Sequence, residues 1–364
     1  MGIRHLAAAL LAGGFVTLSA CGSGSGDVAS ESTAAPPPVP STLGSVTLVT
    51  HDSFSLSEAV LAEFTDQTGY TVRILAPGDA GSMLNQSILT AGDPLGDVIF
   101  GVDTTFLSRA LQAEVTIAYE SPMLDEIPDH LELDSSHRLL PVDVGDVCLN
   151  YDVGWFEDAG LAAPSSLADL AKPDYADLLV VQNPATSSPG LAFLLATVAE
   201  FGVDDEYDWL DFWSDLRSNG VSVQPGWTES YTVEFTIAGG DRPIVVSYAT
   251  SPPAEVFFAD PRPDTAPTAV VEASCFRQQE FVGILRGTDN LEGARALVDF
   301  LLSRTAQEDI PWNMFVFPVN ETAQVPDEFV QYSSVPTDPL SVPAEQIEQN
   351  RETWIEQWTE TVIG

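Results

Sequence analysis

Basic residues are scarce in this chain of 364 residues. Thirteen Lys and Arg, of which only Lys172 is a lysine, stand against 54 Asp and Glu, so the formal net charge at pH 7 is −41. A field of this sign repels nucleic acid and anionic lipid headgroups and attracts small cations. The charge therefore argues against a nucleic-acid partner. Two interpretations remain, namely steering of a cationic ligand and adaptation of the surface to a salty or acidic environment.

Motifs of catalysis and metal binding are also missing. The four histidines are scattered, no Cys-x-x-Cys or His-Glu-x-x-His occurs, and neither glycine pattern for phosphates or dinucleotides is present. The sequence therefore gives no support for a metal site, a cofactor or a catalytic triad. We expect a protein that is not an enzyme.

Cysteine is rare, and one of the three cysteines ends an N-terminal apolar segment. Arg4 and His5 precede an apolar run over residues 6–18, which leads into Leu-Ser-Ala-Cys21. The run is shorter than the roughly 18 residues that a membrane span needs, and its layout is typical of a secretory signal peptide, here residues 1–20. Leu-Ser-Ala-Cys also resembles the lipobox of bacterial lipoproteins. This resemblance implies a lipid on Cys21 that anchors the exported chain to the outer face of the cell membrane.

The segment after Cys21 separates this anchor from the rest of the chain. Residues 21–44 are rich in Gly, Ser, Ala and Pro, a composition that cannot build a core and predicts a flexible linker. The roughly 320 residues that follow exceed what one hydrophobic core usually serves, so we expect two domains.

Strand and helix patterns alternate along this body. Strands are expected at residues 46–50, 70–75, 98–102, 178–182 and 243–248, and helices after the capping-box spacing of Ser55 and Glu58 and at 82–91, 191–201, 292–303 and 344–362. The alternation predicts an α/β fold with parallel sheets and helices on their faces. Ligands of such sheets bind beyond the carboxyl ends of the strands.

Three polar residues follow the first three predicted strands. His51, Asp79 and Asp103 each lie in a segment where a strand ends. Such residues are also ordinary turn and helix-cap residues, but three in succession favour a binding site.

Three consecutive hydroxyls, Thr186, Ser187 and Ser188, precede the helix predicted at 191–201. Free N–H groups and the helix dipole favour an anion or a polar ligand atom there. A simple N-cap followed by Pro189 explains the pattern equally well.

Aromatic residues in loop-like segments form a third group of candidates. Trp227, Tyr248 and Phe315 lie in such segments, and Ser251 follows Tyr248 closely. A cation over an aromatic ring gains roughly 0.5–2 kcal/mol, so such rings could enclose a charged heterocycle. We expect Tyr231 and Phe317, in contrast, to pack in the core.

The two remaining cysteines, Cys148 and Cys275, lie in apolar, strand-like segments. In an exported protein this number favours one disulfide, and a catalytic thiol is the competing interpretation.

Taken in order, these motifs resemble the thiamine-binding periplasmic or lipoprotein components of ABC transporters. The similarity extends from about residue 46 to 358. It is carried by residues 50–54, the loop around Asp79, and residues 98–103, 183–190, 226–231, 247–252, 313–319 and 354–358.

The resemblance implies the type II periplasmic-binding-protein fold, with two parallel-sheet lobes joined by a two-segment hinge. Lobe I would comprise residues 45–146 and 278–364 and lobe II residues 147–277, with the two crossings near Cys148 and Cys275. Thiamine or a thiamine phosphate would bind between the lobes of a monomer, which would deliver it to a membrane permease.

The family's residue roles follow from the same resemblance. Trp227, Tyr248 and Phe315 would contact the rings, Asp79 the aminopyrimidine or the cation, and Ser187 with its neighbours the phosphate or hydroxyethyl end. The chain departs from the family pattern at His51, where Tyr is expected, at Phe315, where Trp is common, and at Ala254, where another Tyr occurs.

Other ligands and one enzyme activity remain as alternatives. A polyamine or iron would keep the fold and change the ligand. Thiamine-cleaving enzymes share the fold and use a cleft cysteine, so a free Cys148 would favour catalysis and a Cys148–Cys275 disulfide would exclude that nucleophile.

Overall fold

The computed structural model describes residues 43–203 and 205–364. The predicted signal peptide, the lipidation site Cys21 and the linker up to residue 42 lie outside the described residues. No helix in the described part of the chain is long and apolar enough to cross a membrane.

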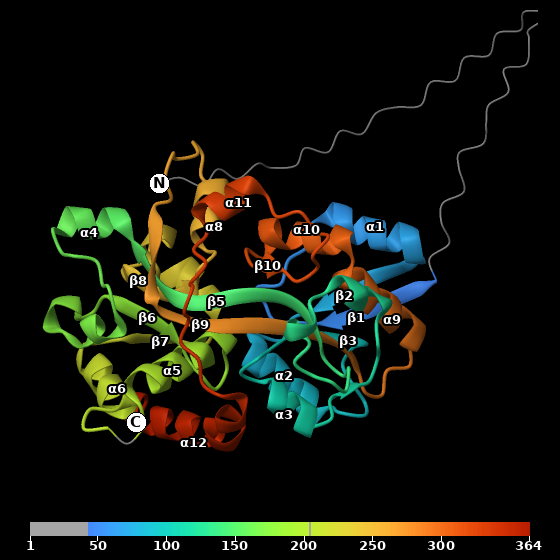
Figure 1. Cartoon of the computed structure of the whole chain (residues 1–364), viewed down its shortest axis with the longest axis horizontal. Coiled ribbons are helices and arrows are strands. Elements are labelled where there is room, and N and C mark those ends of the chain that lie inside the picture. Colours follow the sequence, from blue (N-terminus) through green and yellow to red (C-terminus); the bar gives the residue numbers. More distant parts are fainter. Residues whose placement is uncertain (1–42, 204) are drawn as a thin grey trace, which may run out of the picture. The chain divides into compact units, whose positions relative to one another are not determined.

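The strands form one mixed sheet, with the order β2-β1-β3-β9-β5-β8-β6-β7 (Figure 1). β4 pairs with β9 at one side of this path, and β10 pairs with β5. The strands are β1 (Gly44–Val49), β2 (Tyr70–Leu75), β3 (Val98–Asp103), β4 (Thr116–Ile117), β5 (Leu140–Asp152), β6 (Leu179–Gln182), β7 (Ser222–Gln224), β8 (Ile244–Tyr248), β9 (Thr268–Leu285) and β10 (Phe317–Pro318).

Helices follow most of these strands. The α-helices are α1 (Glu58–Thr68), α2 (Ala80–Leu89), α3 (Leu107–Gln112), α4 (Val153–Ala159), α5 (Ser188–Phe201), α6 (Trp209–Ser218), α7 (Trp227–Glu229), α8 (Pro252–Phe257), α9 (Leu291–Leu302), α10 (Arg304–Asn313), α11 (Asp327–Tyr332) and α12 (Ala344–Val362). Short 3₁₀ turns cover Pro122–Glu126, Asp129–Leu131, Leu167–Ala171, Pro173–Tyr175 and Thr236–Ala238, and a π turn covers Ser230–Glu234.

The predicted elements are confirmed, with corrections at some helix starts. α1 is capped by Ser57, whose side chain accepts a hydrogen bond from Val60 N, and not by Ser55. Ser57 N also donates to Asp309 Oδ2 at 2.7 Å, which fixes the chain at that point. α2 and α5 start at Ala80 and Ser188, two or three residues earlier than predicted, because Asp79 and Ser187 cap them.

Two groups of parallel strands make up the sheet, and two long antiparallel strands join them. β2-β1-β3 and β7-β6-β8 are the parallel groups, while β5 and β9 pair with each other between them. The predicted crossings fall inside these two strands, where Asp146 pairs with Arg277 and Val147 with Phe276. Division into two lobes at this point remains a prediction.

The predicted disulfide is present in the structure. Cys148 and Cys275, on the neighbouring strands β5 and β9, are bonded, with Cα atoms 4.1 Å apart. Both side chains are completely buried, and the register of the two strands shifts between Val147 and Leu149 to accommodate the bridge.

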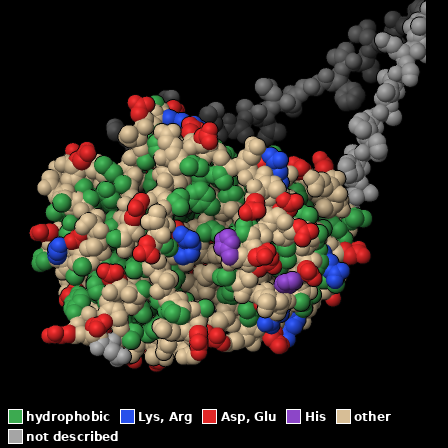
Figure 2. All heavy atoms as spheres, viewed as in Figure 1, with side chains coloured by type: hydrophobic (Ala, Val, Ile, Leu, Met, Phe, Trp, Pro, Cys, Tyr) green, Lys and Arg blue, Asp and Glu red, His purple; other side chains and the backbone are tan. Residues whose placement is uncertain are grey.

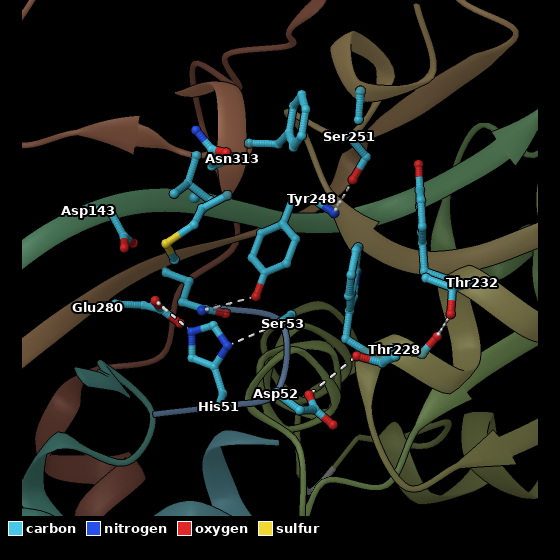
Figure 3. Close-up of a pocket in the computed structure, with 18 of the residues that line it drawn as sticks. His51, Asp52, Ser53, Asp143, Thr228, Thr232, Tyr248, Ser251, Glu280 and Asn313 are labelled. Carbon is cyan, nitrogen blue, oxygen red and sulfur yellow. Dashed lines mark hydrogen bonds and ion pairs between the residues drawn. The ribbon is translucent and has the colours of Figure 1, made fainter. Parts of the chain in front are cut away.

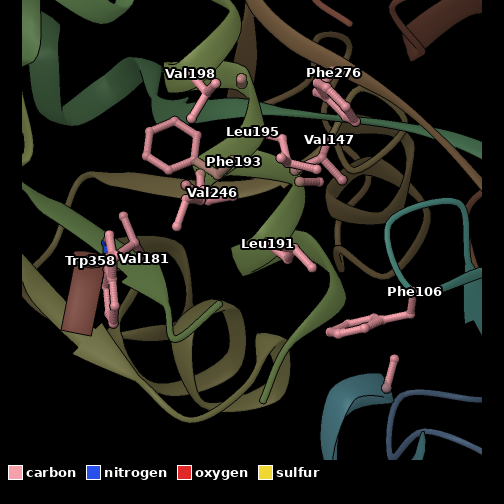
Figure 4. Packing of buried hydrophobic residues seen from close by; sticks show 14 of the residues in the cluster. Phe106, Val147, Val181, Leu191, Phe193, Leu195, Val198, Val246, Phe276 and Trp358 are labelled. Carbon is pink, nitrogen blue, oxygen red and sulfur yellow. The ribbon is translucent and has the colours of Figure 1, made fainter. Parts of the chain in front are cut away.

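Buried side chains form two large clusters, of which the first contains residues from both parallel groups of strands. The first surrounds α5 and includes Phe193 and Val246 (Figure 4). α12 closes this cluster, because Trp358 packs edge-on against Trp213 of α6 with ring centroids 5.5 Å apart. The second cluster lies between β1, β3 and α9. The prediction that Trp358 packs in the core is confirmed.

Candidate ligand-binding cavity

A cavity of about 420 Å³ opens at the carboxyl ends of β1, β7 and β8 (Figure 3). Its volume is in the range of small-molecule sites, about 300–1,000 Å³. The middle of β5 and β9 and the end of α10 complete the wall. The lining residues are His51, Asp52, Ser53, Asp143, Gly145, Trp227, Thr228, Tyr231, Thr232, Tyr248, Ser251, Ala254, Glu255, Phe258, Gln278, Glu280, Asn313, Met314, Phe315 and Val316.

Aromatic rings form one wall of the cavity. Trp227 stacks on Tyr231, with centroids 4.8 Å apart and planes inclined by 13°. Trp227 Nε1 donates to Ser247 Oγ at 2.9 Å, and Tyr231 OH donates to Glu255 Oε1 at 2.7 Å. These hydrogen bonds fix both rings in place. Tyr231, which we expected to be a core residue, is buried and also lines the cavity.

Phe315 adds a ring at the end of α10. Its φ of 55° lies in the left-handed region, which a bulky residue rarely adopts. Its ring packs against Phe258, with centroids 5.5 Å apart, and both rings line the cavity. Non-glycine residues held in this region cluster at functional sites, so the conformation is consistent with a ligand contact.

Carboxylates supply the charge of the cavity. Asp52, Asp143, Glu255 and Glu280 line it, whereas no Lys or Arg of the described ranges does so. Asp52 lies near the turn that carries Trp227, and its Oδ1 accepts from Thr228 Oγ1 at 3.3 Å. Aromatic faces beside carboxylates stabilise a cation and disfavour an anion.

Three acidic residues lie in one row across neighbouring strands. Glu280 of β9 pairs with Asp103 of β3 on one side and with Asp143 of β5 on the other. Burial and the adjacent Glu280 raise the pKa of Asp143 well above its usual value. Burial also raises the pKa of Asp103, to about 6.

His51 approaches this row from the end of β1. Its Nε2 lies 3.5 Å from Glu280 Oε2, and its Nδ1 lies 2.8 Å from Ser53 Oγ. Burial alone would lower the pKa of His51, but Glu280 and two further carboxylates outweigh burial, so the pKa is raised. His51 is therefore the one basic group at an otherwise acidic part of the cavity lining that the structure describes.

Half of the residues predicted from the sequence line the cavity. These are His51, Trp227, Tyr248, Ser251 and Phe315. Ser251 Oγ contacts Ser247 Oγ at 2.7 Å and accepts from Tyr248 N at 3.2 Å, so it orients the strand end that carries Tyr248.

Asp79 and the three hydroxyls after β6 do not line the cavity. Asp79 Oδ2 accepts from Ser187 Oγ and from Trp227 N, each at 2.8 Å, and Asp79 Oδ1 lies 3.3 Å from Ser188 N. Thr186 Oγ1 donates to Pro225 O at 2.6 Å. These groups bind one another, so the simple capping role of Ser187 fits better than a role in the cavity wall.

Asp103 also lies outside the cavity lining. It is completely buried, and its Oδ1 accepts from Thr105 N, Thr105 Oγ1 and Phe106 N at the turn before α3. The carboxylate thus stabilises the turn, which is the ordinary structural role of an Asp after a strand.

Several cavity residues were not predicted. Asp143, Gln278 and Glu280 lie inside the long strands β5 and β9, where the sequence does not reveal which face a residue occupies until the register is known. An acidic residue within an apolar strand is nevertheless unusual, and Val142-Asp-Val144 was a usable signal.

The described residues contain no group of three or more His, Cys, Asp or Glu side chains arranged to hold a metal ion.

Comparison with known proteins identifies the family and the fold. The family model for bacterial extracellular solute-binding proteins matches residues 93–336, which is more than half of the chain. A thiamine-binding periplasmic protein of Salmonella typhimurium is 26% identical over 87% of this chain and 93% of its own length. One from Brucella suis is 25% identical over 86% and 90%.

Solved structures identify the type II periplasmic-binding-protein fold. A periplasmic thiamin binding protein has a TM-score of 0.76, with 24% identity, and covers 87% of this chain and 96% of that one. The ferric ion-binding protein A of Pasteurella haemolytica has a TM-score of 0.65, with 17% identity, over 87% and 97%. At these identities the likeness concerns the fold alone. By the match over residues 93–336, the chain belongs to the family of bacterial extracellular solute-binding proteins.

Proposed function

We propose that this protein captures thiamine or a thiamine phosphate for an ABC importer. The observation that carries the proposal is a cavity with aromatic faces and four carboxylates and, among the described residues, no Lys or Arg. The similarity to thiamine-binding periplasmic proteins over most of the chain supports the same ligand.

Thiamine matches this cavity chemically. It carries a permanent positive charge on one aromatic ring and an amino group on the other. Each aromatic face beside the cation contributes roughly 0.5–2 kcal/mol, and more when water is excluded. Carboxylates compensate for the lost hydration of the charge. Because the hydroxyls of residues 186–188 lie outside the cavity lining, thiamine should bind at least as tightly as its phosphates.

Delivery would depend on closure of the two predicted lobes. Residues 45–146 and 278–364 would move against residues 147–277, with β5 and β9 as the hinge. A ligand that contacts both lobes stabilises the closed form by its differential affinity, and the closed form docks on the permease. Lipidated Cys21 would hold the monomer near that permease, and no reaction would be catalysed.

Isothermal titration of the purified protein tests the ligand. We expect thiamine to bind with a sub-micromolar Kd, and Trp227→Ala to weaken binding by about 1 kcal/mol or more, the contribution of one desolvated cation–π contact. Trp155→Ala is the matched control, because Trp155 packs on Phe156 and does not line the cavity. Equal losses in the two variants, or no thiamine binding at all, would reject the proposal.

A polyamine is the second candidate, favoured by the four cavity carboxylates. Spermidine in the same titration separates the two ligands: spermidine binding without thiamine binding would keep the importer and change its cargo. Iron has less support, because the described residues provide no metal-binding cluster. The thiamine-cleaving alternative requires a free Cys148, whereas Cys148 is bonded to Cys275.

A further inference from the structure

One end of the cavity has buried hydrogen-bond acceptors without donors. Neither carboxylate oxygen of Asp143 has a hydrogen-bond partner among the described residues, and the same holds for Gln278 Oε1. Both side chains are 1% exposed, and both line the cavity. Buried acceptors of this kind are rare in native structures and call for an explanation.

No side chain of the described residues donates a hydrogen bond to these atoms, and His51 Nε2, which also has no hydrogen-bond partner, faces Glu280. Glu280 of β9, which pairs with Asp103 of β3 and with Asp143 of β5, adds a further carboxylate. Its Oε2 is the atom that faces His51. Gln278 Nε2 is turned toward Tyr248 OH, 3.4 Å away, which leaves Gln278 Oε1 free on its other side. In Figure 3, Asp143 and Glu280 lie on the same side of the cavity as His51, whereas Thr228 and Thr232 lie on the opposite side.

This arrangement defines what a ligand must present. A group that donates two or more hydrogen bonds, and that carries or accepts positive charge, suits these free acceptors. A carbonyl, a carboxylate or a phosphate adds further acceptors to a wall that already has a surplus. The same atoms that would hold an amino-substituted ring therefore disfavour its oxo counterpart.

We infer that Asp143, Gln278 and Glu280 form a subsite that selects an amino-substituted nitrogen heterocycle by its N–H donors. The inference rests on the proposed function and adds the part of the ligand that determines specificity. It also reassigns the role expected for Asp79, whose oxygens are occupied by Ser187 Oγ and Trp227 N.

Oxythiamine is a suitable probe, because an oxo group replaces the pyrimidine amino group and the charged thiazolium remains. Sites built to hydrogen-bond a ligand group reject analogues that lack it strongly, so we expect the native protein to bind thiamine at least about 100-fold more tightly than oxythiamine. Asp143→Asn exchanges one acceptor for a donor, and the ratio should fall to about 10 or less.

Two further variants make the test specific. Asp52→Asn makes the same substitution in the same cavity, but Asp52 already accepts a hydrogen bond from Thr228, so the ratio should fall less than in Asp143→Asn. Gln278→Met keeps the length of the side chain, removes Oε1, and should also lower the ratio. If Asp143→Asn does not fold, the affinity ratio of Gln278→Met alone tests the subsite.

The outcomes separate the two proposals. No thiamine binding by the native protein would overturn the proposed function and this inference with it. Equal binding of thiamine and oxythiamine would leave the function standing and overturn the subsite. A ratio that falls as far in Asp52→Asn as in Asp143→Asn would also overturn it, because general electrostatics would then explain the preference.

Discussion

Asp79 connects three segments that are distant in the sequence. It caps α2 through Ala80 N, and its Oδ2 accepts from Ser187 Oγ at the start of α5 and from Trp227 N at the start of α7. The backbone of Trp227 is thus held by one carboxylate. The position of the Trp227 ring in the aromatic wall depends on this contact.

We expect Asp79→Asn to lower the affinity for thiamine by about tenfold or more. The substitution keeps the volume but places an amide NH₂ against donors such as Trp227 N, and hydrogen bonds to charged groups contribute about 1.5–3 kcal/mol each. Isothermal titration gives the affinity, and thermal unfolding gives the stability of the same variant.

Asp134 provides the matched control. It is as buried as Asp79, and it also accepts several hydrogen bonds, from Ser136, Arg138 and Leu139, but it does not line or border the cavity. Asp134→Asn should lower the melting temperature and leave thiamine affinity unchanged. If both variants lose affinity equally, Asp79 acts only through general stability.

At the scale of elements, the disulfide joins the two longest strands. Cys148 and Cys275 are separated by 127 residues in the sequence. A crosslink over so long a loop restricts the unfolded chain, and native disulfides typically contribute about 2–4 kcal/mol. The backbone pairing of β5 and β9 continues on both sides of the bridge, from Leu140 to Asp152.

We therefore expect the variant Cys148→Ala/Cys275→Ala to lose about 2–4 kcal/mol of unfolding free energy and to keep its ligand affinity within about threefold. Urea denaturation with and without reductant measures the unfolding free energy, and isothermal titration measures the ligand affinity. Reductant should destabilise the native protein and leave the variant unaffected. A large loss of affinity would indicate that the bridge sets the geometry of the cavity.

The elements were predictable where a pattern is local. The strand at 98–102 is a continuous apolar run, and α12 has four buried aromatic and aliphatic residues at helical spacing, so both follow from periodicity. The cavity was predictable in part, because Trp227 and Tyr248 are aromatic residues in loop-like segments. Asp143 and Glu280 meet only through the pairing of β5 with β9, across more than one hundred residues. Local periodicity does not reveal that pairing, and a shift of one residue in either strand would turn the carboxylate of that strand to the opposite face.

For the whole molecule, charge and buried carboxylates determine how stability depends on pH. Asp and Glu side chains are spread over the face shown in Figure 2 and do not gather in one region. Together with the net charge of −41, this distribution produces self-repulsion that weakens the folded state. Repulsion diminishes as carboxylates become protonated or as salt screens them.

The burial of titratable side chains also favours the folded state at low pH. It raises the pKa of Asp103 to about 6 and the pKa of Asp143 well above the usual value, while carboxylates raise the pKa of His51 despite burial. A raised pKa means that the folded state binds more protons than the unfolded state. The resulting stabilisation is present at low pH and is lost as the pH rises through the folded-state values. Asp134 has a lowered pKa, because its hydrogen bonds outweigh burial, and it opposes this trend only below about pH 4.

We expect the melting temperature to rise as the pH falls from 8 to about 5, at fixed salt. Each additional proton bound by the folded state contributes about 1.4 kcal/mol per pH unit. Differential scanning calorimetry measures the profile.

Asp143→Asn should flatten this profile and raise stability at pH 8, because a buried carboxylate beside Glu280 has been removed. The exposed Asp66→Asn should leave the slope unchanged. Added NaCl separates the two contributions, since it screens surface repulsion in all three proteins but leaves the difference between native and Asp143→Asn intact. A native profile with the opposite slope, or a difference that disappears in salt, would show that the buried row does not control the response to pH.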